Sequence, residues 1–308
     1  MTSKIIAIQG NDLSKLNPKT DTSVFLANEI QRKKYKIFYY SPKNLSILNS
    51  KVIAKGFFIK FNYENKKFFK ILKRQTLDLS RCKFILIRQD PPFNLEYIST
   101  TYILDRIKNK VKIINNPTSI RNISEKLYSA KYQRFMPYTI FTRDLIEIKR
   151  FIKKHKKIII KPIHGFSGND IHLLNKFNVK FINKFIRKHD HIMCQKFLPK
   201  ISKGDKRVFI INGIVCGAIS RVPKKGSFLS NMSKGAKPIS IELTNMENKI
   251  SKLIAKNLKK ENIFFAGIDF IDQKLNGDIN VTSPTGLKTY FDLTGRNLAK
   301  TFWKELRA

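Results

Sequence analysis

The sequence has few acidic residues. Its 308 residues include 22 Asp and Glu against 61 Lys and Arg, so the formal net charge is +39. Clustered basic residues are typical of nucleic-acid-binding proteins, because they release counterions from phosphates. Here the basic residues run from Lys4 to Arg307, without a zinc-finger pattern, an RRM-like aromatic signature or a terminal basic arm. We interpret most of the charge as compositional bias that aids solubility and attracts anions nonspecifically.

Long apolar runs are also lacking. The longest run we find, residues 264–271, has eight residues and includes Asp269. A membrane-spanning helix needs about 20 apolar residues, so no span is predicted. The four-residue apolar run near the N-terminus is too short for a signal-peptide core. We therefore expect a cytoplasmic protein, and the 42% hydrophobic content excludes disorder of the whole chain.

Cysteine is scarce. Cys82, Cys194 and Cys216 are the three cysteines, and no two form a CxxC pair. This excludes a disulfide framework and favours reduced thiols in the core. The His-Asp-His run at 189–191 lies close to Cys194, but zinc sites usually pair two such groups of ligands, so we do not favour a metal site there.

The first third of the chain alternates between strand and helix patterns. Strands are predicted at 5–8, 36–40, 84–87 and 111–114. Helices are predicted from a cap at Asp21 or Thr22 and over 95–107. This βαβ rhythm predicts a mostly parallel sheet with helices on both faces.

Polar residues follow three of these predicted strands, at 9–12, 88–92 and 115–117. Open parallel sheets bind ligands outside the carboxyl ends of their strands, so the three clusters are consistent with one site. Each cluster also contains ordinary turn-forming residues. A binding site and a set of plain turns both remain open from this pattern alone.

The rhythm changes near residue 120. Helices are predicted at 119–133 and 145–155, followed by strand-like segments at 157–161, 171–174, 192–196, 207–211, 215–221, 267–271 and 279–281. Hairpin turns are indicated at Asn212-Gly213 and Asn276-Gly277. The second half is thus predicted to be α+β, which gives two domains at 1–120 and 121–308.

Residues 161–168 join two of these strands through the sequence Lys-Pro-Ile-His-Gly-Phe-Ser-Gly. Small residues allow backbone N–H groups to approach an anion, and the preceding lysine can neutralise a phosphate. The segment is not a Walker loop, which would lead into a helix. Taken alone, it predicts a nucleotide site no more strongly than an ordinary loop.

Two further groups of charged residues suggest chemistry. Arg207 and Arg221 could hold a transferring phosphoryl group, although solvated surface charge is the simpler interpretation of arginines in so basic a chain. Asp269, Asp278 and Asn280 fall on two strands of a predicted hairpin, where alternate residues share a face. Magnesium prefers such oxygen ligands, and carboxylates are scarce here, so we favour a magnesium site over a surface turn.

The chain resembles the ATP-grasp ligases of the prokaryotic glutathione synthetase type over essentially its whole length. The clearest stretches are IRQDPPFNLEYISTTYIL (87–104), NNPTSIRNISEKLYSA (115–130), IIIKPIHGFSGNDI (158–171), CQKFLPKISKGDKRVF (194–209) and GIDFIDQKLNGDINVTSPT (267–285). The resemblance implies an α/β fold, with an N-terminal parallel-sheet pre-ATP-grasp domain followed by a two-lobed α+β ATP-grasp domain.

The resemblance also implies an activity. ATP would activate γ-glutamylcysteine as an acyl phosphate, and glycine would displace the phosphate, with magnesium, or manganese in its place, as the cofactor. A cytoplasmic homo-oligomer without specific nucleic-acid or membrane partners is implied. The alternatives are another ATP-grasp carboxylate-amine ligase with a different acid or amine, a ligase that binds ATP without turnover, and a nucleic-acid-binding protein that uses the basic surface.

Residue roles follow from the same resemblance. For ATP, the implied residues are Lys126, Lys161, Gly165, Ser167, Gly168, Gln195, Lys196, Phe197, Leu198 and Asp205. For the peptide substrate, they are Arg88, Asp90, Ser283, Pro284 and Thr285. Arg207 and Arg221 would be catalytic, and Asp269, Asp278 and Asn280 would hold the metal.

The chain departs from the family pattern at three places. Asp278 stands where the family usually has glutamate, in a hairpin that we expect to be one residue longer at Asn276-Gly277. Ser167 replaces a usual glycine of the phosphate loop. The mobile glycine-rich segment survives only as residues 230–236, with the sequence SNMSKGA.

Overall fold

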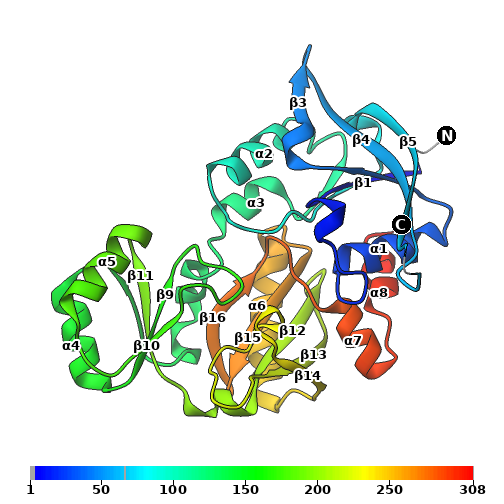
Figure 1. Cartoon of the computed structure of the whole chain (residues 1–308). Helices are drawn as coiled ribbons and strands as arrows, with labels where there is room; N and C mark the ends of the chain where they lie inside the picture. The colour runs from blue at the N-terminus through cyan, green and yellow to red at the C-terminus, as the bar shows by residue number, and fades with distance from the viewer. Residues whose placement is uncertain (1–3, 66, 308) are drawn as a thin grey trace.

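Three β-sheets form the framework of the part of the chain that the structure describes (Figure 1). The computed structural model describes residues 4–65 and 67–307. The first sheet lies in the N-terminal part of the chain, and the other two belong to the second half. The helices cover the faces of these sheets.

The first sheet has seven strands, with β2, β1, β6 and β7 parallel at its centre and edge. Its strands are β1 (Ile5–Gln9), β2 (Lys36–Tyr40), β3 (Leu45–Leu48), β4 (Lys51–Phe61), β5 (Phe69–Asp78), β6 (Phe84–Ile87) and β7 (Lys112–Ile114). Ile6 and Ile8 face one core and Ala7 faces another, because alternate residues of a strand point to opposite sides. Both faces are covered, as parallel sheets require.

Helices from both ends of the chain cover this sheet. They are α1 (Thr22–Gln31), α2 (Leu95–Asp105) and α3 (Pro117–Asn122), with α7 (Leu287–Thr294) and α8 (Leu298–Glu305) from the C-terminus. Asp21 caps α1 as predicted, since its carboxylate accepts from the Val24 N–H. The buried Trp303 of α8 donates its indole N–H to the Leu26 carbonyl at 2.9 Å. The last helices therefore return to the first sheet.

The antiparallel strands β3, β4 and β5 were not predicted. They form one edge of the first sheet, where β4 pairs with β2, β3 and β5. Exposed lysines interrupt their apolar pattern, for example at Lys55, Lys60 and Lys73. The sheet is consequently mixed, with a parallel part and an antiparallel edge.

The second sheet has four antiparallel strands in the order β10-β9-β11-β8. They are β8 (Thr139–Thr142), β9 (Ile158–Pro162), β10 (His172–Leu174) and β11 (Ile192–Lys196). Helices α4 (Leu145–His155) and α5 (Val179–His189) bury their apolar residues with this sheet in one core. The bounds of α4 agree with the prediction, because Asp144 caps its start and Lys156 leaves the helical region at φ 62°.

The third sheet has five antiparallel strands in the order β14-β13-β12-β15-β16. They are β12 (Asp205–Ile211), β13 (Ile214–Val222), β14 (Lys237–Ser240), β15 (Phe265–Ile271) and β16 (Lys274–Asn280), and α6 (Asn245–Lys260) packs against them. The predicted turn at Asn212-Gly213 is confirmed, with φ of 51° and 79°.

The predicted turn at Asn276-Gly277 is wrong. Asp272 and Gln273 make the turn between β15 and β16, with φ of 49° and 61°. Asn276 and Gly277 lie inside β16, where the register shifts opposite Asp269. Asn-Gly is a strong hairpin signal, but here it marks a β-bulge, another place that suits a residue with positive φ.

The single helix predicted over 119–133 is also wrong. Helix α3 ends at Asn122, Ile123 is extended, and a 3₁₀ segment begins at Leu127. Glu125 in the interruption accepts hydrogen bonds from the N–H groups of Val281 and Thr282. Contacts with the segment after the third sheet thus stabilise the break in the helix. The apolar pattern of residues 119–133 contains no information about these contacts.

Asn115 connects the first sheet to the third. Its amide nitrogen donates to the carbonyls of Phe265 and Val281 at 2.7 Å, and its amide oxygen accepts from the N–H groups of Phe264 and Phe265. The side chain is buried. Asn115 therefore satisfies four backbone groups at once and fixes how the two sheets meet.

We predict that Asn115→Ala lowers the free energy of unfolding by about 3–5 kcal/mol, because it leaves buried backbone groups without partners. Asn116→Ala is the matched control. Asn116 only caps α3, so its loss should cost about 1 kcal/mol. Urea unfolding followed by circular dichroism measures both, and equal losses would contradict this account of Asn115.

Candidate active site

A cavity of about 680 Å³ lies where the phosphate loop, the third sheet and the N-terminal part of the chain meet. All but one of the residues predicted for the site line it. The exception is Pro284, which is buried beside the lining residues Ser283 and Thr285. The structure thus brings together side chains that are up to about 200 positions apart in the chain.

Acidic residues concentrate in this cavity. Six of the 22 in the chain line it: Asp21, Asp90, Glu125, Asp205, Asp269 and Asp278. They face seven basic residues: Lys15, Arg88, Lys126, Lys161, Lys196, Arg207 and Arg221. Three of the acids, Asp205, Asp269 and Asp278, form ion pairs with Lys126, Lys161, Arg207 and Arg221, so this part of the cavity is an ion network rather than general surface charge.

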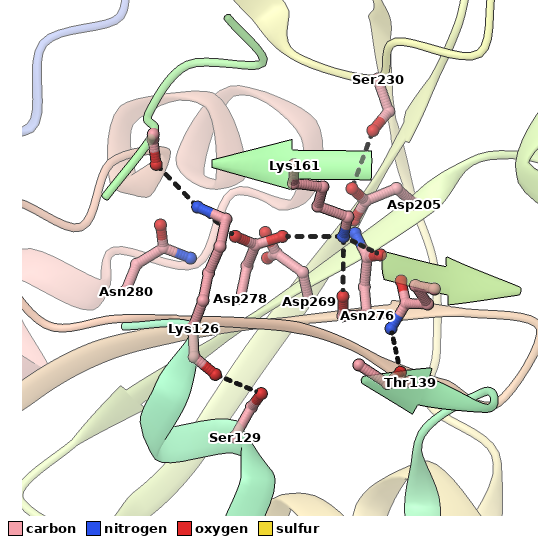
Figure 2. A network of polar contacts seen from close by, with 12 residues as sticks. Lys126, Ser129, Thr139, Lys161, Asp205, Ser230, Asp269, Asn276, Asp278 and Asn280 are labelled. Atoms are coloured by element: carbon pink, nitrogen blue, oxygen red, sulfur yellow. Dashed lines mark hydrogen bonds and ion pairs between the residues drawn. The ribbon is translucent and has the colours of Figure 1, made fainter. Parts of the chain in front are cut away.

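Asp278 lies between two lysines (Figure 2). Lys126 Nζ is 3.2 Å from one carboxylate oxygen, and Lys161 Nζ is 3.7 Å from the other. Lys126 also donates to the Gly165 carbonyl at 2.6 Å. Both lysine side chains are buried, at 7% and 4% exposed, so their charges face the cavity wall rather than bulk water.

The bulge in β16 places Asp278 in this position. Lys161 Nζ donates to the Asn276 carbonyl and to its side-chain oxygen, at 2.9 and 3.0 Å. Gly277, which lies between Asn276 and Asp278 in the sequence, has φ of 88°. A Cβ at Gly277 would lie 2.4 Å from the Met193 methyl carbon. The irregular strand therefore brings both Asp278 and Asn276 to the ammonium group of Lys161.

The electrostatics of Asp278 follow from these neighbours. Burial raises the pKa of its carboxyl, but Lys126 and Lys161 outweigh this and lower the pKa to about 2. Burial lowers the pKa of Lys161, and Asp278 opposes that shift. Lys126 and Lys161 thus keep the Asp278 carboxylate ionised, and the carboxylate in turn holds both lysine side chains in place.

A second ion network runs across β12, β13 and β15. The register places Arg207 opposite Asp269, and Asp205 opposite Arg221. Arg207 contacts Asp269 through two nitrogens, at 2.5 and 2.7 Å, and Arg221 bridges Asp269 and Asp205 at 3.0 and 2.7 Å. All four side chains are buried, and cross-strand pairing explains their order.

The two carboxyls of this network differ. Burial raises the pKa of Asp205 despite Arg221, whereas the two arginines hold the pKa of Asp269 below its usual value against the effect of burial. Burial alone would lower the pKa of Arg221, but Asp205 and Asp269 raise it above the usual value. Arg221 therefore stays cationic at the cavity wall.

The end of β11 and the phosphate loop form the rest of this side. Gln195 donates to the Thr139 hydroxyl at 3.0 Å and is followed in the lining by Lys196, Phe197 and Leu198. In the phosphate loop, a Cβ on Gly165 would lie 2.4 Å from a Pro162 ring carbon. Gly165 therefore permits a tight turn that a larger residue would disturb.

The N-terminal part of the chain contributes another wall of the cavity. Arg88 is buried and donates from Nε to the Ser23 hydroxyl at 3.1 Å; burial lowers its pKa. Asn11 orients Asp90, accepting from its N–H and donating to its carboxylate. Ser283 donates to the Arg88 carbonyl at 3.4 Å, which links this wall to the segment after β16.

Some lining residues were not predicted. The clearest is Glu125, whose carboxylate accepts from the Val281 and Thr282 N–H groups and from the Thr282 hydroxyl at 2.8–3.0 Å. An acid next to Lys126 in so basic a chain was a signal that could have identified it. Lys15, Asn17, Asp21 and Ser23 also line the cavity, and no spacing pattern marks them.

Two of the three polar clusters after predicted strands do not line the cavity. Residues 9–12 support it through Asn11, and 115–117 serve the packing role of Asn115. Within the described residues, no group of three or more His, Cys, Asp or Glu side chains is arranged to hold a metal ion. The His-Asp-His run at 189–191 therefore forms no such group either.

Cys82, Cys194 and Cys216 are free, as predicted.

Comparison with known proteins identifies the family. Residues 5–121 match the N-terminal domain of prokaryotic glutathione synthetase, and residues 125–295 match its ATP-grasp domain. The chain belongs to the prokaryotic glutathione synthetase family. It is 33% identical over 302 residues to the glutathione synthetase of Bradyrhizobium diazoefficiens, covering 97% of this chain and 96% of that one. The Buchnera aphidicola glutathione synthetase is 36% identical over 294 residues, covering 93% and 90%.

Solved structures share the fold. D-cycloserine synthetase DcsG has a TM-score of 0.67 at 12% identity, with 98% of each chain covered. D-alanyl-alanine synthetase A from Vibrio cholerae has a TM-score of 0.64 at 13% identity, covering 100% of this chain and 98% of that one. The ATP-grasp ligase PsnB, solved with a precursor variant, Mg and ADP, has a TM-score of 0.63 at 13% identity, with 99% of each chain covered. The predicted ATP-grasp architecture is confirmed.

Family membership confirms the predicted class of activity. The chain is an ATP-dependent carboxylate-amine ligase of glutathione synthesis. ATP-grasp ligases generally use ATP with Mg²⁺. None of the helices in the described part of the chain is long and apolar enough to cross a membrane.

We predict a specific acid sensitivity from Asp278. Its folded pKa of about 2 lies below the ordinary value of 3.8, so its stabilising contribution is complete above about pH 4 and is lost as the pH falls towards 2. This contribution is on the order of 2 kcal/mol. The difference in unfolding free energy between wild type and Asp278→Asn should therefore shrink between pH 4 and pH 2.

Urea unfolding at a series of pH values measures this difference. Asp272→Asn is the control, because Asp272 lies in the turn of the same hairpin and pairs only with the exposed Lys200. A wild-type advantage over Asp278→Asn that is constant down to pH 2 would contradict the ion-pair account.

Proposed function

We propose that the cavity joins γ-glutamylcysteine to glycine in two steps. In the first, a carboxylate oxygen of the cysteinyl residue bonds to the γ-phosphorus of ATP, and the bond to ADP breaks. In the second, the glycine nitrogen bonds to the acyl carbon, phosphate leaves with the bonding pair, and the amine loses a proton. The single observation that carries this proposal is that one cavity combines buried lysines, paired arginines and a first-domain arginine.

The nucleotide is proposed to lie on the side of the second and third sheets. Lys126 and Lys161 are buried, point into one place and are held by Asp278, so they meet phosphates without further ordering (Figure 2). Gly165, Ser167 and Gly168 line the same side. The Gly165 N–H donates to the Pro162 carbonyl at 3.2 Å, so Ser167 and Gly168 are the residues proposed to offer backbone N–H groups. Residues 195–198, with Asp205 nearby, are proposed to contact the adenine and ribose end.

Asp269, Asp278 and Asn280 suit magnesium by their chemistry. All three line the cavity, and they supply two carboxylates and an amide, which are hard oxygen ligands. Magnesium usually binds one or two carboxylates together with nucleotide phosphates, so a set without a third acid fits an ion that arrives with ATP. When bound, the ion neutralises phosphate charge. Manganese accepts similar ligands.

Arg207 and Arg221 are proposed to stabilise the transferring phosphoryl group and the acyl phosphate. Their guanidinium groups are fixed by Asp269 and Asp205 before any substrate binds. Fixed positive charge lowers the energy of a charged transition state because the protein does not need to reorganise during the reaction. The arginines thus bind and orient, and Asp205 and Asp269 position them.

The peptide acid is proposed to bind the first-domain wall. Arg88 is a buried cation, and Asp90 lies beside it, so the pair offers a partner to both a carboxylate and an ammonium group. Ser283 and Thr285 lie opposite, with Pro284 shaping their backbone. Enclosure between the two parts of the chain shields the acyl phosphate from water.

We predict that ADP formation requires γ-glutamylcysteine, glycine and Mg²⁺ together, since transfer needs both an acid and an amine. A coupled assay for ADP, with each component omitted in turn, measures this. Other acids and amines belong in the same assay, because the fold is shared with D-cycloserine synthetase and D-alanyl-alanine synthetase A. Turnover with one of those acids and none with γ-glutamylcysteine would reassign the substrate.

We further predict that Asp278→Asn lowers turnover by 100-fold or more while the fold survives. The variant loses a magnesium ligand and the charge that holds Lys126 and Lys161. Activity should be measured over a range of Mg²⁺ concentrations, with Asp272→Asn as a control that keeps full activity. Unchanged turnover in Asp278→Asn would show that the metal and the lysines do not need this carboxylate.

The cellular setting is proposed from the same family resemblance. We propose a cytoplasmic enzyme that forms a homo-oligomer, with no specific nucleic-acid partner. Light scattering of the purified protein would measure its mass against the 35.9 kDa of one chain. A mass of one chain over the working concentration range would rule out the oligomer.

A further inference from the structure

Two loops meet above the cavity. The phosphate loop, residues 163–171, joins β9 to β10, and a second loop, residues 223–236, joins β13 to β14. We call the second one the roof loop. Both supply lining residues, with Phe166, Ser167 and Gly168 from the first and 228–233 from the second.

A pair of serine hydroxyls connects the two loops. The Oγ atoms of Ser167 and Ser233 are 3.0 Å apart, which is a hydrogen-bond distance. Ser167 has φ of 56°, a left-handed conformation that costs a serine of order 1 kcal/mol and a glycine almost nothing. The strained residue is thus the one whose side chain reaches the roof loop.

A second contact lies beside the first. A Cβ on Gly168 would lie 2.3 Å from the side-chain oxygen of Asn231, so the loops approach here as closely as a glycine allows. On its other side, the roof loop is anchored by Ser230, whose buried hydroxyl donates to Asp205 at 2.7 Å. The roof loop is therefore fastened both to the third sheet and to the phosphate loop.

We propose that Ser167 and Ser233 form a latch that keeps the roof loop closed and slows the release of nucleotide from the cavity. This inference rests on the proposed function in one respect, namely that nucleotide binds beneath the phosphate loop. Nucleotide can leave only after the two loops separate, and that separation breaks the hydroxyl pair. The serines are positioning residues, because they act on the loops and need not touch the reacting atoms.

The dissociation rate of a fluorescent ADP analogue tests the latch. The full-length protein is loaded with the analogue and Mg²⁺, mixed with excess ATP, and followed by stopped-flow fluorescence. Ser233→Ala and Ser167→Gly should each speed release about two- to fivefold, the effect of losing one partly exposed neutral hydrogen bond. The double variant should be no faster than either single variant, because the same bond is lost only once.

Three controls separate a latch from a general loss of structure. Ser227→Ala makes the same change in the roof loop, but Ser227 bonds only within that loop, to the Leu229 N–H, so release should keep its wild-type rate. Ser233→Thr keeps a hydroxyl and should restore slow release. Ser167→Gly relieves the left-handed strain, so its melting temperature should not fall even though release is faster.

Three results would overturn the latch: an unchanged release rate in Ser233→Ala, single effects that multiply in the double variant, or an equal effect of Ser227→Ala. If any of these occurs while wild type binds the analogue and turns over γ-glutamylcysteine and glycine, only the latch fails. If wild type binds no nucleotide, the proposed function fails and the latch fails with it.

Discussion

The contact of Asp278 with Lys126 and Lys161 is the interaction on which the rest of the site depends. The three residues come from three places: the break after α3, the end of β9, and the bulge in β16. Two buried lysines near each other repel, and the carboxylate between them compensates the repulsion. Because the partners belong to different sheets, this one ionic group also fixes where the second sheet stands relative to the third.

The regular elements were predictable wherever the apolar pattern was simple. The strand at 84–87 is wholly buried, and α4 carries a cap and an apolar stripe, so both stand out in the sequence. The irregularities that serve the site were not predictable. The break before Lys126 and the bulge before Asp278 interrupt regular structure because distant side chains bind there, and a local pattern contains no information about those partners.

The residues that we propose for the site were predicted one by one through family resemblance, and all but Pro284 line the cavity, whereas composition and spacing alone suggested only parts of the set. Family resemblance identifies residues that belong to recognisable motifs, such as Gly165 in the phosphate loop. It did not identify Glu125, which accepts hydrogen bonds from backbone N–H groups directly before the residues that we propose for the peptide substrate. It also gave no reason for Ser167, because the partner that explains a serine there lies 66 positions away.

The scarcity of acidic residues gives a physical reason why the lysine and arginine side chains of this site are conformationally ordered. In a chain of net charge +39, each cavity lysine or arginine would otherwise be one of many mobile surface cations. Ordering a free lysine or arginine side chain costs up to about 2 kcal/mol, which substrate binding would have to supply. Asp205, Asp269 and Asp278 compensate part of that cost when the protein folds, because they hold Lys126, Lys161, Arg207 and Arg221 in place. These four cations are therefore already positioned for the phosphate contacts that we propose. The few acids are therefore concentrated where fixed positive charge is needed.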